Sequence, residues 1–204
     1  MSRCRIICVA GGTASGKTTL ARELYRLGGD ERVQVLPLDS YYHDRSNLTP
    51  EERAAVNYDH PDSLEIKLLR FHLDVLRNGN GIEAPVYDFS THSRSKEVQK
   101  VAPTDVVIIE GILALHFPEL RETYAYSVFV DTEDDLRLQR RLTRDVSERG
   151  RTEKSVHDQW NATVHPMHTK YCAPTRTLAS EVMIGETWSE EELTGLWRRI
   201  LSAV

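Results

Sequence analysis

The chain has 204 residues and a mass of 23.3 kDa, and 40% of its residues are hydrophobic and 28% charged. This size and composition are typical of a globular domain with its own core, which excludes disordered and fibrous proteins. The net charge of −5, from 31 acidic and 26 basic residues, argues against a nucleic-acid-binding protein. Cys4, Cys8 and Cys172 form no CxxC pair, so we expect reduced thiols and a cytoplasmic location. No apolar run approaches the roughly 18 residues that span a membrane, and neither secretion nor a membrane partner is expected.

Short apolar runs alternate with helix-like segments along the chain. The apolar runs predict strands at residues 5–10, 33–38, 105–110, 127–130 and 181–184. Helices are expected at residues 17–27, from 50, from 62 to 77, over 118–123, over most of 132–178 with an interruption at Gly150, and from 189. Because parallel strands need crossover connections, the alternation predicts an α/β fold with a five-stranded parallel sheet flanked by helices. No linker or repeat divides residues 1–204, which are expected to form a single domain.

Three capping-box patterns predict where helices begin: Thr49–Glu52, Asp62–Glu65 and Ser189–Glu192. The second is expected to start a longer helix with one buried stripe, formed by Ile66, Leu69, Leu73 and Leu76. Residues 82–101 follow that helix and have the pattern of a β-excursion, with strands at 82–89 and 96–101 and a polar turn at 90–95. The chain therefore carries a hairpin in addition to its parallel sheet.

A glycine-rich segment after the first strand satisfies the pattern G-x-x-x-x-G-K-[ST]. It comprises Gly11, Gly12, Thr13, Ala14, Ser15, Gly16, Lys17 and Thr18, and Thr19 follows it. Glycines let backbone N–H groups turn toward an anion, the next helix presents its positive end there, Lys17 reaches the β- and γ-phosphates, and Thr18 can ligate Mg²⁺. The alternative is a plain glycine turn with a solvated lysine. The strand before the segment and the helix after it favour nucleotide binding.

Two acidic residues follow apolar strands. Asp39 is expected to end the second strand and Glu110 the third, and ligands of parallel sheets collect at the carboxyl ends of strands. Each could instead cap a neighbouring turn or helix. Because the phosphate loop ends at the same edge of the sheet, we favour a functional role. Glu110 would then hold Mg²⁺, and Asp39 would accept a proton from an attacking hydroxyl group.

Arginines are concentrated in the polar helical segment. Arg137, Arg140, Arg141 and Arg144 recur at helical spacing and are expected to share one face, and Arg149 and Arg151 flank Gly150. Interspersed acids allow a solvated, salt-bridged helix as the alternative. Arginines also stabilise the charge of a transferred phosphoryl group, and the glycine is typical of a hinge, so residues from about 133 to 160 are interpreted as a lid.

Six ordered blocks carry a family resemblance: GGTASGKTT, DSYYHD, NYDHPDS, PVYDFSTHSR, IEGILAL and RDVSERGR. With them the chain resembles the uridine kinases, also called uridine–cytidine kinases, of the P-loop kinase superfamily, from about residue 5 to 178. The resemblance implies transfer of the γ-phosphate of ATP or GTP to the 5′-hydroxyl of uridine or cytidine, with Mg²⁺, in pyrimidine salvage. It also implies a homotetramer that is inhibited by UTP and CTP.

The resemblance implies a role for individual residues. Asp39 matches the general base and a neighbour of Mg²⁺, Thr18 and Glu110 match metal-site positions, and Lys17, Arg144 and Arg149 match phosphate contacts. The positions implied to contact the nucleoside are Asp59 and Arg141 at the ribose, Tyr87, Phe89 and His92 at the base, and Arg151 and Gln159 beside them. A neutral imidazole can donate or accept a hydrogen bond according to its tautomer, so His92 is expected to serve both uracil and cytosine.

Several readings remain open. The family usually carries an Arg-Gly-Gly-like loop near the donor base, whereas residues 185–189 read GETWS here, which leaves the choice between ATP and GTP undecided. His165 and His168 could indicate a metal site, but the sequence shows no acidic partner in register with them. The alternative functions are a related P-loop kinase for another small alcohol and a regulatory nucleotide-binding switch.

Overall fold

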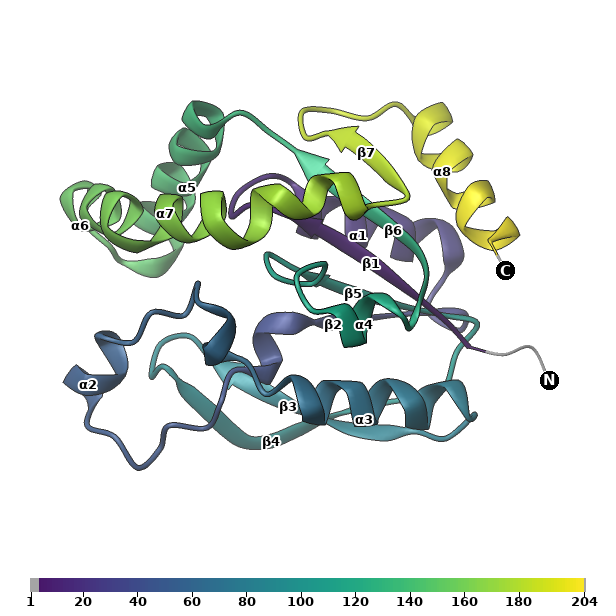
Figure 1. Ribbon diagram of the computed structural model, residues 1–204, viewed down its shortest axis with the longest axis horizontal. Helices are drawn as coiled ribbons and strands as arrows, with labels where there is room; N and C mark the ends of the chain where they lie inside the picture. The colour runs from purple at the N-terminus through teal and green to yellow at the C-terminus, as the bar shows by residue number, and fades with distance from the viewer. Residues whose placement is uncertain (1–3, 204) are drawn as a thin grey trace.

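The computed structural model describes residues 4–203. Five parallel strands form the central sheet in the order β2-β5-β1-β6-β7 (Figure 1). They are β1 (Arg5–Gly11), β2 (Val33–Pro37), β5 (Val106–Gly111), β6 (Tyr124–Asp131) and β7 (Glu181–Ile184). The predicted fold class and the five strands are confirmed, although β6 begins earlier than its apolar run.

Helices cover both faces of this sheet. Their bounds are α1 (Lys17–Gly28), α2 (Pro50–Ala54), α3 (Ile66–Arg77), α4 (Pro118–Arg121), α5 (Asp134–Arg149), α6 (Glu153–Gln159), α7 (His165–Met167) and α8 (Glu190–Ser202). In Figure 1, α5 and α6 lie at the left, above α2, at the end of the sheet where β1 finishes. No helix within residues 4–203 combines the length and the apolar character needed to cross a bilayer.

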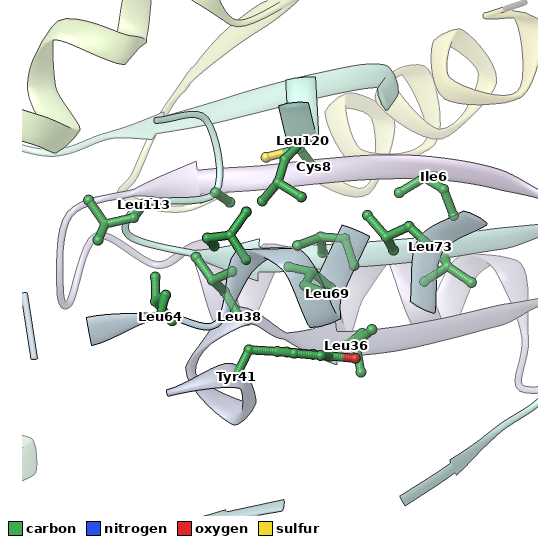
Figure 2. Packing of buried hydrophobic residues seen from close by; sticks show 14 of the residues in the cluster. Ile6, Cys8, Leu36, Leu38, Tyr41, Leu64, Leu69, Leu73, Leu113 and Leu120 are labelled. Carbon is green, nitrogen blue, oxygen red and sulfur yellow. The ribbon is translucent and has the colours of Figure 1, made fainter. Parts of the chain in front are cut away.

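The two faces of the sheet form separate hydrophobic cores. Successive side chains of a strand point to opposite faces, so Ile6 and Cys8 of β1 pack with α3 whereas Ile7 and Val9 pack with α1 and α8. Figure 2 shows the first of these cores, in which Leu69 and Leu73 of α3 lie against the sheet. The buried stripe predicted for this helix is confirmed. The three cysteines are free and buried, as expected of reduced thiols.

The hairpin is formed by β3 (Ile82–Asp88) and β4 (Ser93–Val101), which are antiparallel. Its turn is shorter than the predicted 90–95. The carboxylate of Asp88 accepts hydrogen bonds from the backbone N–H and hydroxyl of Ser90 and from the hydroxyl of Thr91, which closes the chain tightly. The residues after His92 are therefore free to join β4.

One predicted helix start is wrong. Helix α3 begins at Ile66, and residues 61–63 form a separate 3₁₀ turn in which Asp62 is exposed. Glu65 cannot complete a capping box because its carboxylate pairs with Arg94 of the hairpin at 2.8 Å. The boxes at Thr49 and Ser189 are both present.

Candidate active site

Three strands of the sheet end at one place. Val9 of β1 and Pro37 of β2 both pair with Glu110 of β5, and β1 leads directly into the phosphate loop. The chain after β2 turns through a 3₁₀ segment at Leu38–Tyr41. The phosphate loop, Glu110 and the segment after β2 are therefore neighbours, as the strand-end argument predicted.

The phosphate loop has the geometry of an anion cradle. Gly16 has a φ of 98° and stands at the N-cap of α1, so no side chain occupies the positive end of the helix. Ala14 is also in the left-handed region, with a φ of 59°, and the N–H of Ser15 donates to the carbonyl of Gly12 at 3.1 Å. The remaining N–H groups at the start of α1 are available to phosphate oxygens.

Thr18 and Glu110 meet beside this cradle. The hydroxyl of Thr18 donates to a carboxylate oxygen of Glu110 at 3.2 Å. Burial raises the pKa of Glu110, while the nearby Lys17 opposes that rise. A carboxyl group and a hydroxyl group are hard oxygen ligands, which is the donor type that Mg²⁺ takes together with phosphate oxygens. The two side chains fit a magnesium site next to a bound nucleotide.

Asp39 lies two residues beyond the end of β2, although it was predicted to end that strand. Strand β2 ends at Pro37, and Asp39 belongs to the 3₁₀ turn that follows. Burial raises the pKa of Asp39, and the positive charge of Lys17 and a hydrogen bond with Tyr42 oppose the shift. Lys17 of the phosphate loop and the hydroxyl group of Tyr42 therefore stabilise the ionised form of the Asp39 carboxyl group.

Two arginines of α5 form hydrogen bonds with the phosphate loop. Arg137 is only 1% exposed and donates to the carbonyl of Thr13 at 3.4 Å, and Arg141 donates to the Thr13 hydroxyl at 3.0 Å. The alternative of a solvated arginine face does not hold for these two side chains. Arg140 leaves the predicted common face and donates to the carbonyl of Gly185.

Four arginines between residues 141 and 151 surround one buried acid. Asp145 is fully buried and forms ion pairs with four guanidinium groups, those of Arg141, Arg144, Arg149 and Arg151. Gln159 accepts hydrogen bonds from Arg141 at 2.8 Å and from Arg151. The predicted lid residues are thus brought together. Asp145 was predicted only as one of several acids interspersed among these arginines.

Aromatic side chains gather around the hairpin turn. Tyr87 contacts Phe89 edge to face with ring centroids 5.2 Å apart, and it contacts Tyr42 at 5.0 Å. Tyr58 stacks on His92 at 5.4 Å with an interplanar angle of 16°. Tyr42 and Tyr58 were not predicted as site residues, although both lie within the DSYYHD and NYDHPDS blocks.

His92 stands at the tip of the hairpin in a conformation that is rare for a residue with a side chain, with a φ of 50°. Burial lowers the pKa of its imidazole, and Arg151 and Arg53 lower it further. The ring is therefore neutral at pH 7. Arg149 lies over the ring of Phe89, 5.5 Å from its centroid, and so connects the lid with the hairpin.

Asp59 lies beside the phosphate loop. It lines a crevice together with Thr13 of that loop and with Met167 and Cys172. Burial raises the pKa of Asp59, and Arg141 opposes the rise. A carboxylate beside a guanidinium group at this place can bind a pair of hydroxyl groups.

His165 of α7 has a hydrogen-bond partner, whereas the buried Nδ1 of His168, just after α7, has none among the described residues. His165 hydrogen bonds with Asp134 at 2.9 Å, so the acid that the sequence did not reveal comes from α5. Burial and the charge of Arg137 lower the pKa of His168 to about 4. In the part of the chain that the structure describes, no three His, Cys, Asp or Glu side chains are grouped to hold a metal ion.

The sheet order, the phosphate loop at the end of β1 and the helical segment over it define the class of the protein, which is a P-loop kinase. Two solved structures share this fold. Phosphoribulokinase from Rhodobacter spheroides matches with a TM-score of 0.65 at 15% identity, covering 93% of this chain and 74% of that one. D-glycerate 3-kinase from Cryptococcus neoformans matches with a TM-score of 0.62 at 19% identity, covering 86% of this chain and 81% of that one.

Sequence comparisons identify the family. Residues 6–186 match the Phosphoribulokinase / Uridine kinase family, to which the chain belongs. A uridine kinase from Clostridium perfringens strain ATCC 13124 is 44% identical over 183 residues, which are 90% of this chain and 88% of that protein. A uridine kinase from Halalkalibacterium halodurans is 47% identical over 178 residues, which are 87% of this chain and 84% of that protein.

Proposed function

We propose that the protein is a uridine kinase, which transfers the γ-phosphate of ATP or GTP to the 5′-hydroxyl group of uridine or cytidine. The observation that carries the proposal is the position of the half-buried Asp39 in the turn after β2, at the sheet edge where the phosphate loop begins, where the charge of Lys17 opposes the rise of its pKa. A switch protein needs no proton acceptor at this place, whereas phosphorylation of an alcohol does. The identity with uridine kinases over most of the chain supports the same reaction.

Each group of site residues has a separate role in the proposed reaction. The N–H groups of the phosphate loop and Lys17 hold the donor phosphates, and Asp39 accepts the proton of the 5′-hydroxyl as its oxygen attacks phosphorus. Arg144 and Arg149 offset the negative charge on the transferred phosphoryl group. Thr18, Glu110 and Asp39 would hold Mg²⁺, which when bound neutralises charge on the phosphate oxygens.

The acceptor lies between the hairpin and the lid in this proposal. Asp59 and Arg141 bind the ribose hydroxyl groups, and Arg151 and Gln159 hold the nucleoside from the lid side. At the base, Tyr87 and His92 contact the pyrimidine 4-position and Phe89 lines the pocket. The aromatic cluster and the neutral imidazole support this assignment, because both suit a planar, uncharged ring.

The same proposal covers the organisation of the molecule. Residues 1–204 form a single P-loop kinase domain, in which the hairpin at 82–101 binds the base and residues from about 133 to 160 close as a lid. We also propose a cytoplasmic homotetramer that UTP and CTP inhibit, on the family resemblance alone. Light scattering coupled to size exclusion measures the assembly, and a monomer would contradict it.

A coupled assay of ADP or GDP release tests the function. The purified chain is given ATP or GTP with Mg²⁺ and a panel of uridine, cytidine, purine nucleosides, ribulose 5-phosphate and glycerate. We expect turnover only with the two pyrimidine nucleosides, and mass spectrometry should identify the product as the 5′-monophosphate. Turnover with a different alcohol would indicate a related kinase, and slow hydrolysis that no acceptor accelerates would indicate a switch.

A further inference from the structure

Asp145 has more cationic partners than an ordinary salt-bridge residue. Its Oδ1 lies 2.8 Å from Nη2 of Arg144 and 3.6 Å from Nη1 of Arg149. Its Oδ2 lies 3.4 Å from Nε of Arg141 and 3.7 Å from Nη1 of Arg151. Each oxygen therefore lies within ion-pair distance of two guanidinium groups, and the side chain itself is fully buried. Oδ1 accepts a hydrogen bond from Nε of Arg144 at 2.9 Å, whereas Oδ2 accepts none from the described residues.

The two oxygens face arginines of different proposed roles. Arg144 and Arg149, on Oδ1, are the residues assigned to the transferred phosphoryl group. Arg141 and Arg151, on Oδ2, also donate to the Gln159 side chain, and these residues are assigned to the nucleoside. One carboxylate thus lies between the phosphate half and the nucleoside half of the lid.

The local backbone brings these arginines to Asp145. Arg141 and Arg149 lie one helical turn to either side of Asp145 on α5, so the helix alone aligns them. Arg151 lies beyond the end of α5. The chain turns back toward Asp145 there because Gly150 adopts a left-handed conformation with a φ of 62°. The N–H of Arg151 then donates to the carbonyl of Asp145 at 3.1 Å. Without a central negative charge, four neighbouring cations would repel one another and separate.

We propose that Asp145 is a positioning residue, which holds the arginines of both halves of the lid in one arrangement before substrates bind. The inference rests on the proposed function for the roles of those arginines. One carboxylate offsets only part of the positive charge of four arginines. The cluster therefore keeps an excess of positive charge, which is available to phosphate oxygens. Asp145 acts through the arginines and does not itself touch the reacting atoms.

The first experiment compares Asp145→Asn with the unmodified chain and with Asp135→Asn. Asp135 is exposed in the first turn of the same helix, so the control loses the same charge away from the cluster. For Asp145→Asn we expect kcat to fall by roughly 10-fold or more and the KM for uridine to rise several-fold. The Kd of ADP, measured by calorimetry, should stay within about threefold because the phosphate loop is unaltered. The control should match the unmodified chain in all three quantities.

Two further variants separate positioning from a loss of folding. Asp145→Glu keeps the charge, and we expect its kcat to exceed that of Asp145→Asn. In the background Arg144→Gln/Arg149→Gln, adding Asp145→Asn should lower kcat by less than about threefold, since the two arginines assigned to the transferred phosphoryl group are already absent. Equal kcat values for the Glu and Asn variants, or an undiminished loss in the double-variant background, would overturn the proposal.

A readout without catalysis keeps the inference apart from the proposed function. Trypsin cleaves after arginine, and the bonds after Arg149 and Arg151 lie in the segment that Asp145 secures. We expect brief trypsin treatment to cut Asp145→Asn there several-fold faster than Asp135→Asn, as measured by fragment mass. Equal cutting rates would contradict the positioning role. An unmodified chain that shows no uridine-dependent turnover would refute the proposed function and leave this comparison interpretable.

Discussion

Replacement of Asp39 by asparagine changes one carboxylate oxygen to an amide nitrogen and preserves the shape of the side chain. The hydrogen bond with Tyr42 can persist, because an asparagine carbonyl oxygen still accepts a hydrogen bond. What disappears is the ability to take the proton of the attacking hydroxyl. The variant therefore tests the proposed base with little disturbance of the packing around it.

The expected loss follows from that single function. A positioned general base contributes about 10²- to 10⁴-fold to a rate, or roughly 2.7 to 5.4 kcal/mol at 1.36 kcal/mol for each factor of ten. Lys17 loses a neighbouring negative charge, so the phosphate loop becomes no less attractive to a triphosphate. We expect kcat to fall at least 100-fold and the KM for ATP to stay within about threefold.

The assay is steady-state release of ADP at saturating uridine, repeated from pH 5 to pH 8. Burial raises the pKa of Asp39, so the reactive carboxylate is lost as the pH falls through that raised pKa. The unmodified enzyme should lose kcat/KM for uridine on the acid side, and Asp39→Asn should lack that acid limb. Near-normal turnover by the variant, or an acid limb identical to that of the unmodified enzyme, would refute the assignment of Asp39.

Three other changes have defined outcomes. Glu110→Gln should raise the Mg²⁺ concentration for half-maximal rate roughly 10-fold or more, because a carboxylate near the metal is lost; an unchanged Mg²⁺ titration would remove Glu110 from the site. Gly150→Ala should lower the free energy of unfolding in urea by about 1 kcal/mol, since its φ is 62°, whereas Gly195→Ala inside α8 should raise it. Equal effects of the two substitutions would contradict this reasoning. Protonated His92 can still donate to uracil O4 but can no longer accept a hydrogen bond from the cytosine amino group. The lowered pKa of His92 lies below 6.5. As the pH falls through this range, the KM for cytidine should therefore rise more than the KM for uridine. A constant ratio of the two KM values from pH 7.5 to 5 would exclude this contact.

The features that sequence predicted well depend on contiguous residues or on a rule of topology. The phosphate loop is a single segment of chain, and its residues need only each other to form the cradle. Asp39 and Glu110 are distant in sequence, yet they could be placed together because the carboxyl ends of parallel strands meet at one edge. Even there the detail differed, since Pro37 ends β2 and Asp39 belongs to the following turn.

The features that sequence missed depend on a distant partner. Asp62 and Glu65 have the spacing of a capping box, but Arg94 of the hairpin binds the glutamate and the helix begins later. The segment from Trp160 to Cys172 was predicted as helix, and it contains two π-helical turns that shift the side-chain spacing. Hydrophobic periodicity reports an average helical repeat and does not mark such insertions.

Asp145 shows why composition alone misjudges a charged helix. Acids and arginines mixed along α5 favour a solvated surface by their numbers, and a surface ion pair contributes little to stability. Burial reverses that conclusion, because a fully buried carboxylate requires compensating charge, and the compensating groups include the arginines that we propose for the reaction. In this proposal the ion pairs that order the segment and the groups that contact substrate belong to one cluster. A substitution there should change kcat and the nucleoside KM together, whereas a substitution in the phosphate loop should change donor binding first.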